Sequence, residues 1–275
     1  MTFKEILDKA TEYLKNHHVE EAKNSAWQLM EFVWHINRSY YFAHSGDIIR
    51  DSEKMQYMSL IRRRAEHEPL QYITNQAHFM GYTYYVNEDV LIPRFDTEIL
   101  VEEVGKHVRP DNRVLDMCTG SGCIAIALGL EHTRLNITGV DISPNAIDIA
   151  RRNAEELKAD VTFVESNLFD KVTGKYNIII SNPPYIRTAE ISGLMSEVQS
   201  HEPRLALDGK CDGLYFYRQI VELAHNYLFE NGYLAFEIGY DQRAEVSQMM
   251  KAAGYHNIEV TKDLAGLDRV VIGQR

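Results

Sequence analysis

The chain has 275 residues, of which 45% are hydrophobic and 25% charged, a composition typical of a globular protein with one or two domains. Its formal net charge of −11 argues against a protein that binds the phosphates of nucleic acids without a partner. Three cysteines without a CxxC pair predict no disulfide framework and no zinc site, and no stretch approaches roughly 18 apolar residues, so we expect a cytoplasmic protein with no bound metal and no membrane partner.

Residues 1–72 are predicted to form a small helical domain. Apolar side chains recur at helical spacing in residues 3–14, and this charged, amphipathic start lacks the apolar core of a signal peptide. Residues 24–36 repeat the pattern, with Asn24 or Ser25 expected as the residue that caps the helix. A third helical pattern covers residues 52–69.

From residue 73 the sequence pattern changes from helical to β-rich. In residues 73–93 aromatic and β-branched residues alternate around Gly81, which predicts a β-hairpin linking two domains. From residue 94 to residue 275, short apolar runs alternate with helical patterns. Strands are expected at residues 113–117, 136–141, 160–165, 176–181, 232–239, 256–260 and 269–274, with helices at 122–130, 143–157, 213–228 and 241–254. This order predicts an α/β domain with an open, mostly parallel sheet, whose ligands bind at the carboxyl ends of the strands.

The first candidate site is the turn in VLDMCTGSGCIAIAL, residues 114–128, between a strand and a helix. Gly120 and Gly122 allow a tight turn and a close approach of ligand to backbone, although this pattern alone suits a dinucleotide enzyme equally. Asp141 ends the next strand, where an acidic side chain can accept hydrogen bonds from ribose hydroxyls. Asp116 places a second carboxylate beside the turn. Two carboxylates suit the sulfonium and ammonium of S-adenosylmethionine better than a pyrophosphate.

After the third strand, Asn167 is expected to bond the adenine edge and Phe169 to stack on its face. A core position is the alternative for Phe169.

The second candidate site is NPPY, residues 182–185, directly after the fourth strand. Pro183 and Pro184 fix the backbone and remove two N–H donors, and Asn182 is biased to an extended form by the proline that follows it. The side-chain carbonyl of Asn182 and the backbone carbonyl of Pro183 then form a pair of acceptors for a planar NH₂ group, and Tyr185 can lie against its flat face. Accepting both hydrogens favours an in-line transfer of a methyl group to that nitrogen.

Together these motifs resemble class I S-adenosylmethionine-dependent methyltransferases. The chain is similar more closely to the peptide chain release factor glutamine methyltransferases, the HemK or PrmC family, through EPLQYIT, FMGY, LIPRFDTE, HEPRLALDGKCDGL, LAFEIGYDQ and DLAGLDRVV. The resemblance runs from about Glu68 to Val271. It implies methylation of the N5 amide of the glutamine in the Gly-Gly-Gln loop of class I release factors, with S-adenosyl-L-homocysteine as the second product and with the helical domain contacting the protein substrate.

The resemblance also assigns residues to both ligands. The expected cofactor-binding residues are Asp116, Cys118, Thr119, Gly120, Ser121, Gly122, Asp141, Ile142, Asn167, Phe169 and Asn182. The expected catalytic residues are Asn182, Pro183 and Tyr185, and Pro184 joins them in the substrate-binding set. The chain departs from the family pattern where glycine is frequent, at Cys118 and Asn75, and also at Phe95 and Asn167. Within IPRFDTE, residues 92–98, we expect Arg94, Asp96 and Glu98 near the site, either ordering a lid or forming ion pairs. Glu237 is expected to have a supporting role.

Three alternatives stay open at this point. A nucleic-acid methyltransferase acting on adenine N6 or guanine N2 could use the same corner, but it should carry a basic groove and aromatic side chains for a flipped base. A glutamine methyltransferase of a ribosomal protein would have the same site. A cofactor-binding scaffold without activity is disfavoured by the presence of both motifs side by side.

Overall fold

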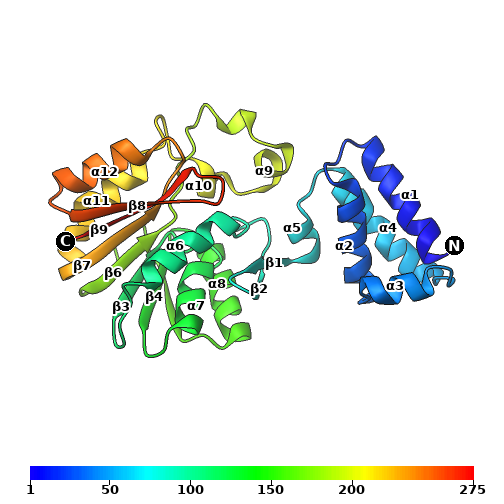
Figure 1. Ribbon diagram of the computed structural model, residues 1–275, viewed down its shortest axis with the longest axis horizontal. Helices are drawn as coiled ribbons and strands as arrows, with labels where there is room; N and C mark the ends of the chain where they lie inside the picture. Colours follow the sequence, from blue (N-terminus) through cyan, green and yellow to red (C-terminus); the bar gives the residue numbers. More distant parts are fainter. The chain divides into compact units, whose positions relative to one another are not determined.

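The computed structural model describes residues 1–275, which divide into two compact units (Figure 1). The first unit contains Met1–Asn75 together with Met195–His201, and the second contains Gln76–Leu194 and Glu202–Arg275. None of the helices combines the length and the apolar character that crossing a bilayer requires. The sequence predicts domain limits at residues 72 and 93. These limits remain predictions, because the division into compact units describes contacts and does not test them.

The first unit is a helical bundle. Its helices are α1 (Phe3–Asn16), α2 (Ala22–Trp34), α3 (Arg38–His44), α4 (Asp51–Ala65), α5 (Leu70–Thr74) and, from the far part of the chain, α9 (Ser196–His201). The Thr2 hydroxyl accepts the Glu5 N–H and the Glu5 carboxylate accepts the Thr2 N–H, a capping box that explains where α1 begins. The core is apolar and fully buried, with Ile6, Leu14, Leu29, Met30, Tyr57 and Ile61 at its centre.

The N-cap expected for the second helix is wrong. α2 begins at Ala22, and Ser25 lies inside it and is buried. The Ser25 hydroxyl accepts a hydrogen bond from the guanidinium of Arg64, which also donates to the Glu68 carbonyl and pairs with Glu197 of α9. A serine hydroxyl can satisfy a buried arginine as well as a helix end, and only the packing of α2 on α4 decides which it does.

The second unit is built on a seven-stranded sheet in the order β5-β4-β3-β6-β7-β9-β8. Its strands are β3 (Arg113–Met117), β4 (Asn136–Asp141), β5 (Val161–Glu165), β6 (Tyr176–Ser181), β7 (Leu228–Glu237), β8 (His256–Lys262) and β9 (Asp268–Gln274). β3 to β7 pair in parallel, whereas β9 runs antiparallel to both β7 and β8. The predicted α/β fold with a mostly parallel sheet and a helical N-terminal region is confirmed.

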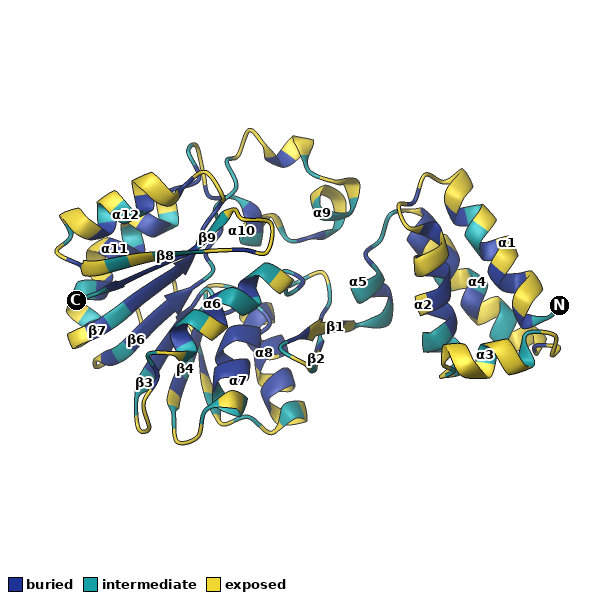
Figure 2. Cartoon of the chain, in the orientation of Figure 1, coloured by how far each residue is buried: buried dark blue, intermediate teal, exposed yellow.

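Helices cover both faces of the sheet (Figure 1). α6 (Phe95–Gly105), α7 (Cys123–Glu131) and α8 (Pro144–Leu157) pack on one face, and α11 (Tyr215–Tyr227) and α12 (Arg243–Ala252) pack on the other. The central strands are therefore buried on both sides, as Figure 2 shows. α8 begins as expected, because the Ser143 hydroxyl accepts the Ala146 N–H and Pro144 stands at the first helical position.

A hairpin of β1 (Gln76–Phe79) and β2 (Tyr82–Tyr85) precedes the sheet. It begins later than the expected 73, since residues 70–74 form α5. The buried Asn153 side chain of α8 accepts the N–H of Tyr85 and donates to the carbonyls of Tyr85 and Ser121. One carboxamide thus ties the hairpin to the glycine-rich turn.

The switch point of the sheet lies between β3 and β6, because the chain runs outward from β3 to β5 and then returns to the other side of β3. At this point the Ser181 hydroxyl donates to the Met117 carbonyl over 2.6 Å, which holds the two strand ends together. Ligands of open α/β sheets bind at such crevices. The short α10 (Arg204–Leu207) and the 3₁₀ turn η1 (Ile191–Gly193) lie in the connection that follows β6.

Candidate active site

A cavity of about 260 Å³ opens in the second unit at the carboxyl ends of β3, β4 and β6. It lies where the sheet topology predicts a ligand. Many of the residues expected to bind cofactor or substrate line it: Cys118, Thr119, Gly120, Ser121, Asp141, Ile142, Asn167, Asn182 and Pro184. Asp141 is the last residue of β4, and the others lie in the segments that follow β3, β4, β5 and β6.

The turn between β3 and α7 is held by backbone hydrogen bonds. The Thr119 N–H donates to the Val140 carbonyl over 2.9 Å, and the Gly122 N–H donates to the Thr119 carbonyl over 2.9 Å. Gly120 and Gly122 both have positive φ, at 53° and 79°. A Cβ at Gly122 would meet side-chain atoms of Ala150, Phe163 and Ile126 at about 3 Å, whereas a Cβ at Gly120 would point into open space. The missing side chain at Gly122 therefore lets α7, α8 and β5 pack closely, whereas the missing side chain at Gly120 leaves space at the cavity.

Asp141 connects the end of β4 to this turn. Its carboxylate accepts the N–H of Gly120 over 2.9 Å and the N–H of Ser143 over 3.0 Å. Burial raises the pKa of Asp141, and these backbone donors oppose the rise. Asp141 lines the cavity, and a carboxylate oxygen that accepts one N–H can accept a second donor, so the side chain has capacity for two hydroxyls of a ribose.

Asp116 lies beneath the turn and not on the cavity surface. Its side chain is fully buried, one oxygen accepts the Thr119 hydroxyl over 2.5 Å, and the other has no hydrogen-bond partner. Burial raises the pKa of Asp116 to about 7. A buried carboxyl with an unpaired oxygen is a group that a nearby cation would stabilise.

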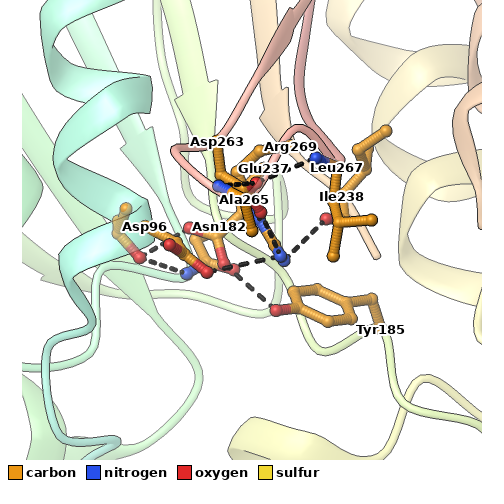
Figure 3. A network of polar contacts seen from close by, with 10 residues as sticks. Asp96, Asn182, Tyr185, Glu237, Ile238, Asp263, Ala265, Leu267 and Arg269 are labelled. Atoms are coloured by element: carbon orange, nitrogen blue, oxygen red, sulfur yellow. Dashed lines mark hydrogen bonds and ion pairs between the residues drawn. The ribbon is translucent and has the colours of Figure 1, made fainter. Parts of the chain in front are cut away.

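Asn182 belongs to a polar network that reaches from the cavity into the core (Figure 3). Its Nδ2 donates to the Thr97 hydroxyl over 3.2 Å, and the Thr97 hydroxyl donates to the Glu237 carboxylate over 2.5 Å. The Tyr185 hydroxyl donates to the other oxygen of Glu237 over 3.1 Å. Glu237 is buried, which raises its pKa, and the bonds from Thr97 and Tyr185 and the charge of Arg269 oppose the rise.

Several predicted site residues do not reach the cavity. The stacking role expected for Phe169 is not supported, because its ring is buried in the core and stacks on Tyr227 with centroids 4.6 Å apart, while Leu168 lines the cavity instead. Phe169 therefore occupies the core position that the sequence leaves open as the alternative. Pro183 and Tyr185 also lie outside the lining, and the Tyr185 hydroxyl is bonded to Glu237.

The segment IPRFDTE supplies both lining and support. Arg94 lines the cavity and pairs with the buried Glu202, while Asp96 contacts Arg269 at 3.3 Å and Glu98 accepts the Met80 N–H at 2.6 Å. Ion pairing, one of the two expectations, describes the contacts of Arg94 and Asp96, whereas Glu98 bonds a backbone N–H.

Some residues of the site lie outside the set that the sequence predicts. Thr97 lines the cavity, and so do Glu88 and Asp89 before IPRFDTE and Pro203, Leu205, Ala206 and Phe216 further along. The predicted helices also omit α6, in which Thr97 lies, although the apolar spacing of Leu100, Val101 and Val104 was a usable signal.

The charged groups on the cavity wall are mostly acidic. Glu88, Asp89 and Asp141 face one basic residue, Arg94, whose charge is already paired. No group of three or more His, Cys, Asp and Glu side chains is placed to hold a metal ion. Such a wall suits a ligand that carries positive charge and no phosphate.

Comparison with known proteins gives the family. Residues 5–74 match the model of the PrmC N-terminal domain, and residues 94–210 match that of the methyltransferase small domain. The release factor glutamine methyltransferase of Geobacter sulfurreducens is 39% identical over 99% of this chain and 96% of its own length. The enzyme of the same name from Clostridium acetobutylicum is 37% identical over 100% and 99% of the two chains. This chain belongs to the release factor glutamine methyltransferase family.

Solved structures agree with the fold of this family. A methyltransferase from Pyrococcus furiosus covers 70% of this chain and 87% of its own with a TM-score of 0.53 at 16% identity. The 16S rRNA N2 G1207 methyltransferase of T. thermophilus, solved with AdoMet and guanosine, covers 73% of this chain and 49% of its own with a TM-score of 0.52 at 15% identity. At such identities the likeness extends to the fold alone.

Proposed function

We propose that this protein transfers a methyl group from S-adenosylmethionine to the side-chain amide nitrogen of the glutamine in the Gly-Gly-Gln loop of a class I peptide chain release factor. The observation that carries the proposal is the position of Asn182. In a family whose members are named for glutamine methylation, Asn182 lines a cavity beside a glycine-rich turn, with its amide nitrogen engaged by Thr97.

The residues present fit the cofactor. Gly120 leaves open space where backbone and ligand can approach closely, Asp141 can accept two ribose hydroxyls, and Asp116 has an unpaired buried oxygen. The predominantly acidic wall favours a sulfonium and an ammonium. When bound, S-adenosylmethionine supplies an electrophilic methyl group on positively charged sulfur.

The chain's own residues position the acceptor nitrogen. We assign the Asn182 Oδ1, at the cavity, as the acceptor for one hydrogen of the glutamine amide, and Pro184 as a rigid part of the wall. The Pro183 carbonyl lies outside the cavity lining in this structure, and we propose that it accepts the second hydrogen when the substrate is bound. Holding both hydrogens turns the nitrogen lone pair toward the methyl donor, and the fixed geometry makes the reaction effectively unimolecular. No strong base is required, because the nitrogen loses its proton after it has been methylated.

The helical first unit is proposed to recognise the protein substrate. Its α2 and α4 pack on a buried apolar core, and its outer faces are free to contact a folded partner. A folded substrate needs a larger surface than a glutamine pocket provides, since specific protein interfaces cover on the order of 1,600 Å² in total.

Transfer of label from methyl-labelled S-adenosylmethionine tests this function. The full chain is incubated with a release factor, with its Gln→Ala loop variant, with total RNA and with ribosomal proteins. We expect label in the intact release factor alone, on one glutamine located by mass spectrometry. Label in RNA would favour the nucleic-acid alternative, label in a ribosomal protein would favour the second alternative, and equal label in the Gln→Ala variant would refute the assigned residue.

A further inference from the structure

The polar network behind Asn182 contains two side chains that no motif assigns to the reaction. Glu237 ends β7, and the register between β6 and β7 pairs Ser181 with Phe236, so Asn182 and Glu237 follow paired residues on neighbouring strands. Thr97 comes from the first turn of α6 and inserts its hydroxyl between them. All three residues belong to the second unit.

The number of hydrogens available decides which group donates and which accepts in each hydrogen bond of this network. A threonine hydroxyl has one hydrogen, and Thr97 donates it to the carboxylate of Glu237 over 2.5 Å. The hydroxyl oxygen can then only accept. It must therefore face the NH₂ edge of the Asn182 carboxamide, whose Nδ2 lies 3.2 Å away, because the oxygen edge would place two acceptors against each other.

A carboxamide is planar, and fixing its nitrogen fixes its oxygen. With Nδ2 turned to Thr97, Oδ1 of Asn182 points away from the network. Asn182 and Thr97 line the cavity whereas Glu237 does not, and we place the Oδ1 edge of the carboxamide, which Thr97 does not occupy, at the cavity. The opposite orientation would offer the cavity a donor, which cannot accept the hydrogens of an amide NH₂ group.

The same carboxylate also holds the other end of the NPPY segment. Its second oxygen accepts the Tyr185 hydroxyl over 3.1 Å, so Glu237 is tied to both Asn182 and Tyr185 across the two prolines (Figure 3). Arg269 lies nearby, where it is itself paired with Asp263 at 2.9 Å, and its charge opposes the rise in the pKa of Glu237 that burial causes. Thr97 and Tyr185 both donate to Glu237, and an ionised carboxylate provides the two acceptor oxygens that these hydrogen bonds need.

We propose that Thr97 and Glu237 are positioning residues that set the orientation of the Asn182 carboxamide, so that its oxygen and not its nitrogen meets the substrate amide. This inference rests on the proposed function, because the group to be gripped is an amide NH₂. A competing view is that the network only supports the fold at the ends of β6 and β7. The two views predict different outcomes for closely matched variants.

The test compares Thr97→Val with Thr97→Ser. Valine keeps the shape and loses the hydroxyl, whereas serine keeps the hydroxyl. We expect Thr97→Val to lower kcat about 10- to 100-fold, with little change in the cofactor Kd or in the KM for release factor, and Thr97→Ser to stay close to the unmodified enzyme. Equal kcat for Thr97→Val and the unmodified enzyme would overturn the proposal.

Thr119→Val is the matched control. It also deletes a buried hydroxyl that donates to a buried carboxylate over 2.5 Å, but it does so beneath the glycine-rich turn. We expect it to weaken cofactor binding, measured by calorimetry, rather than to act on kcat alone. If both variants changed only thermal stability, in parallel, the network would be a support of the fold and the proposal would be wrong.

A double-mutant cycle shows whether Thr97 acts through Asn182. In an Asn182→Ala background, Thr97→Val should reduce kcat no further, since there is no carboxamide left to orient. An additional loss equal to that of the single variant would contradict the proposal.

Glu237→Gln and Glu237→Leu supply an independent measurement if Thr97→Val folds poorly. Glutamine keeps one carbonyl acceptor for Thr97 and can donate to the Tyr185 oxygen, so it should retain most of kcat. Leucine removes both acceptors and should lower kcat as Thr97→Val does, and an unchanged kcat would count against the proposal.

A readout without turnover separates this inference from the proposed function. The side-chain NH₂ resonances of Asn182, assigned by their loss in Asn182→Ala, should shift and exchange faster with solvent in Thr97→Val but not in Thr97→Ser. If the unmodified enzyme failed to methylate release factor and these resonances still behaved as expected, the proposed function would be wrong and the orientation correct. Identical resonances in both variants would overturn the orientation itself.

Discussion

The backbone N–H of Gly120 donates to a carboxylate oxygen of Asp141 over 2.9 Å, so the turn after β3 is fastened to the end of β4. The other oxygen of Asp141 accepts the Ser143 N–H at the entry to α8. A single carboxylate at the end of β4 therefore joins the turn after β3 to the entry of α8, beside the cavity. It does this with the same side chain that we assign to the ribose.

Asp141→Asn tests this double role. Asparagine keeps the shape but replaces one acceptor with a donor, which opposes either the Gly120 N–H or the Ser143 N–H. Because hydrogen bonds to charged groups contribute about 1.5 to 3 kcal/mol, we expect the cofactor Kd to rise about 10- to 100-fold. Calorimetry measures the Kd, and a Kd equal to that of the unmodified protein would remove Asp141 from the site.

Gly120→Ala and Gly122→Ala should separate cofactor binding from stability. At Gly122 the new Cβ would meet three side chains at about 3 Å with φ at 79°, so we expect a loss of about 2 kcal/mol or more in the free energy of unfolding. At Gly120 only the positive φ opposes alanine, a cost of about 1 kcal/mol, but the Cβ would enter the space assigned to the cofactor. Denaturant unfolding and calorimetry on both variants check the contrast. The reverse ranking would show that the roles of the two glycines are exchanged.

Cys118 stands at a φ of 62°, a conformation that favours glycine. Asn75, the other position where the family often has glycine, has a φ of 54° at the end of α5. Cys118→Gly relieves the strain and increases the entropy of the unfolded chain, so we expect a change within about 1 kcal/mol in unfolding free energy. Cys118→Val adds a β-branched side chain in the same conformation and should cost about 2 kcal/mol. Thermal unfolding of the pair measures the difference, and equal melting temperatures would argue against strain at this position.

The raised pKa of Asp116 predicts that cofactor binding depends on pH. A cation beside the buried carboxyl favours its ionised form, so binding should lower the pKa from about 7 and release a proton when the pH is below that value. The affinity should therefore fall as the pH decreases through 7. Calorimetry in two buffers with different ionisation enthalpies counts the released protons. Asp116→Asn should remove this part of the pH dependence, and an unaltered profile would assign the protons to another group.

The same shift makes a prediction for stability without ligand. The folded state binds the Asp116 proton more tightly than the unfolded chain, whose carboxyl has a pKa of 3.8. The contribution of this group to the free energy of unfolding is thus complete below about pH 4 and decreases as the pH rises to about 7. Denaturant unfolding across this range should give a shallower decrease for Asp116→Asn than for the unmodified protein. Parallel curves would contradict the burial of the charge.

Asn182→Ala should separate turnover from binding. Removal of a preorganised polar group at the reacting atoms lowers kcat by about 100- to 1,000-fold in comparable sites, whereas many other residues still line the cavity for the cofactor. We expect a kcat loss of this size with most of the cofactor affinity retained. Single-turnover kinetics and calorimetry on one preparation give both quantities, and an equal loss of both would show that Asn182 serves the cofactor instead.

Local patterns were sufficient for most of the fold. The apolar spacing of α1 and α4, the Ser143-Pro144 start of α8 and the alternating strands and helices from residue 113 onward all correspond to elements of the structure. They succeed because helix and strand periods and caps depend on residues within a few positions of one another. The N-cap of α2 failed for the complementary reason, since Ser25 is bonded by Arg64, 39 residues away.

The sequence by itself determined the α/β class of the second domain, the glycine-rich turn and the stiff NPPY corner, because positive φ, fixed proline φ and periodicity are properties of short segments. Only the tertiary structure decided that Phe169 packs against Tyr227 and that Thr97 lies between Asn182 and Glu237. The contacts of Thr97 join residues that are 85 and 140 positions apart, through the pairing of β6 with β7 and the packing of α6. Which of these groups donates and which accepts depends on the donors and acceptors that the fold brings together. A local sequence pattern does not contain that information.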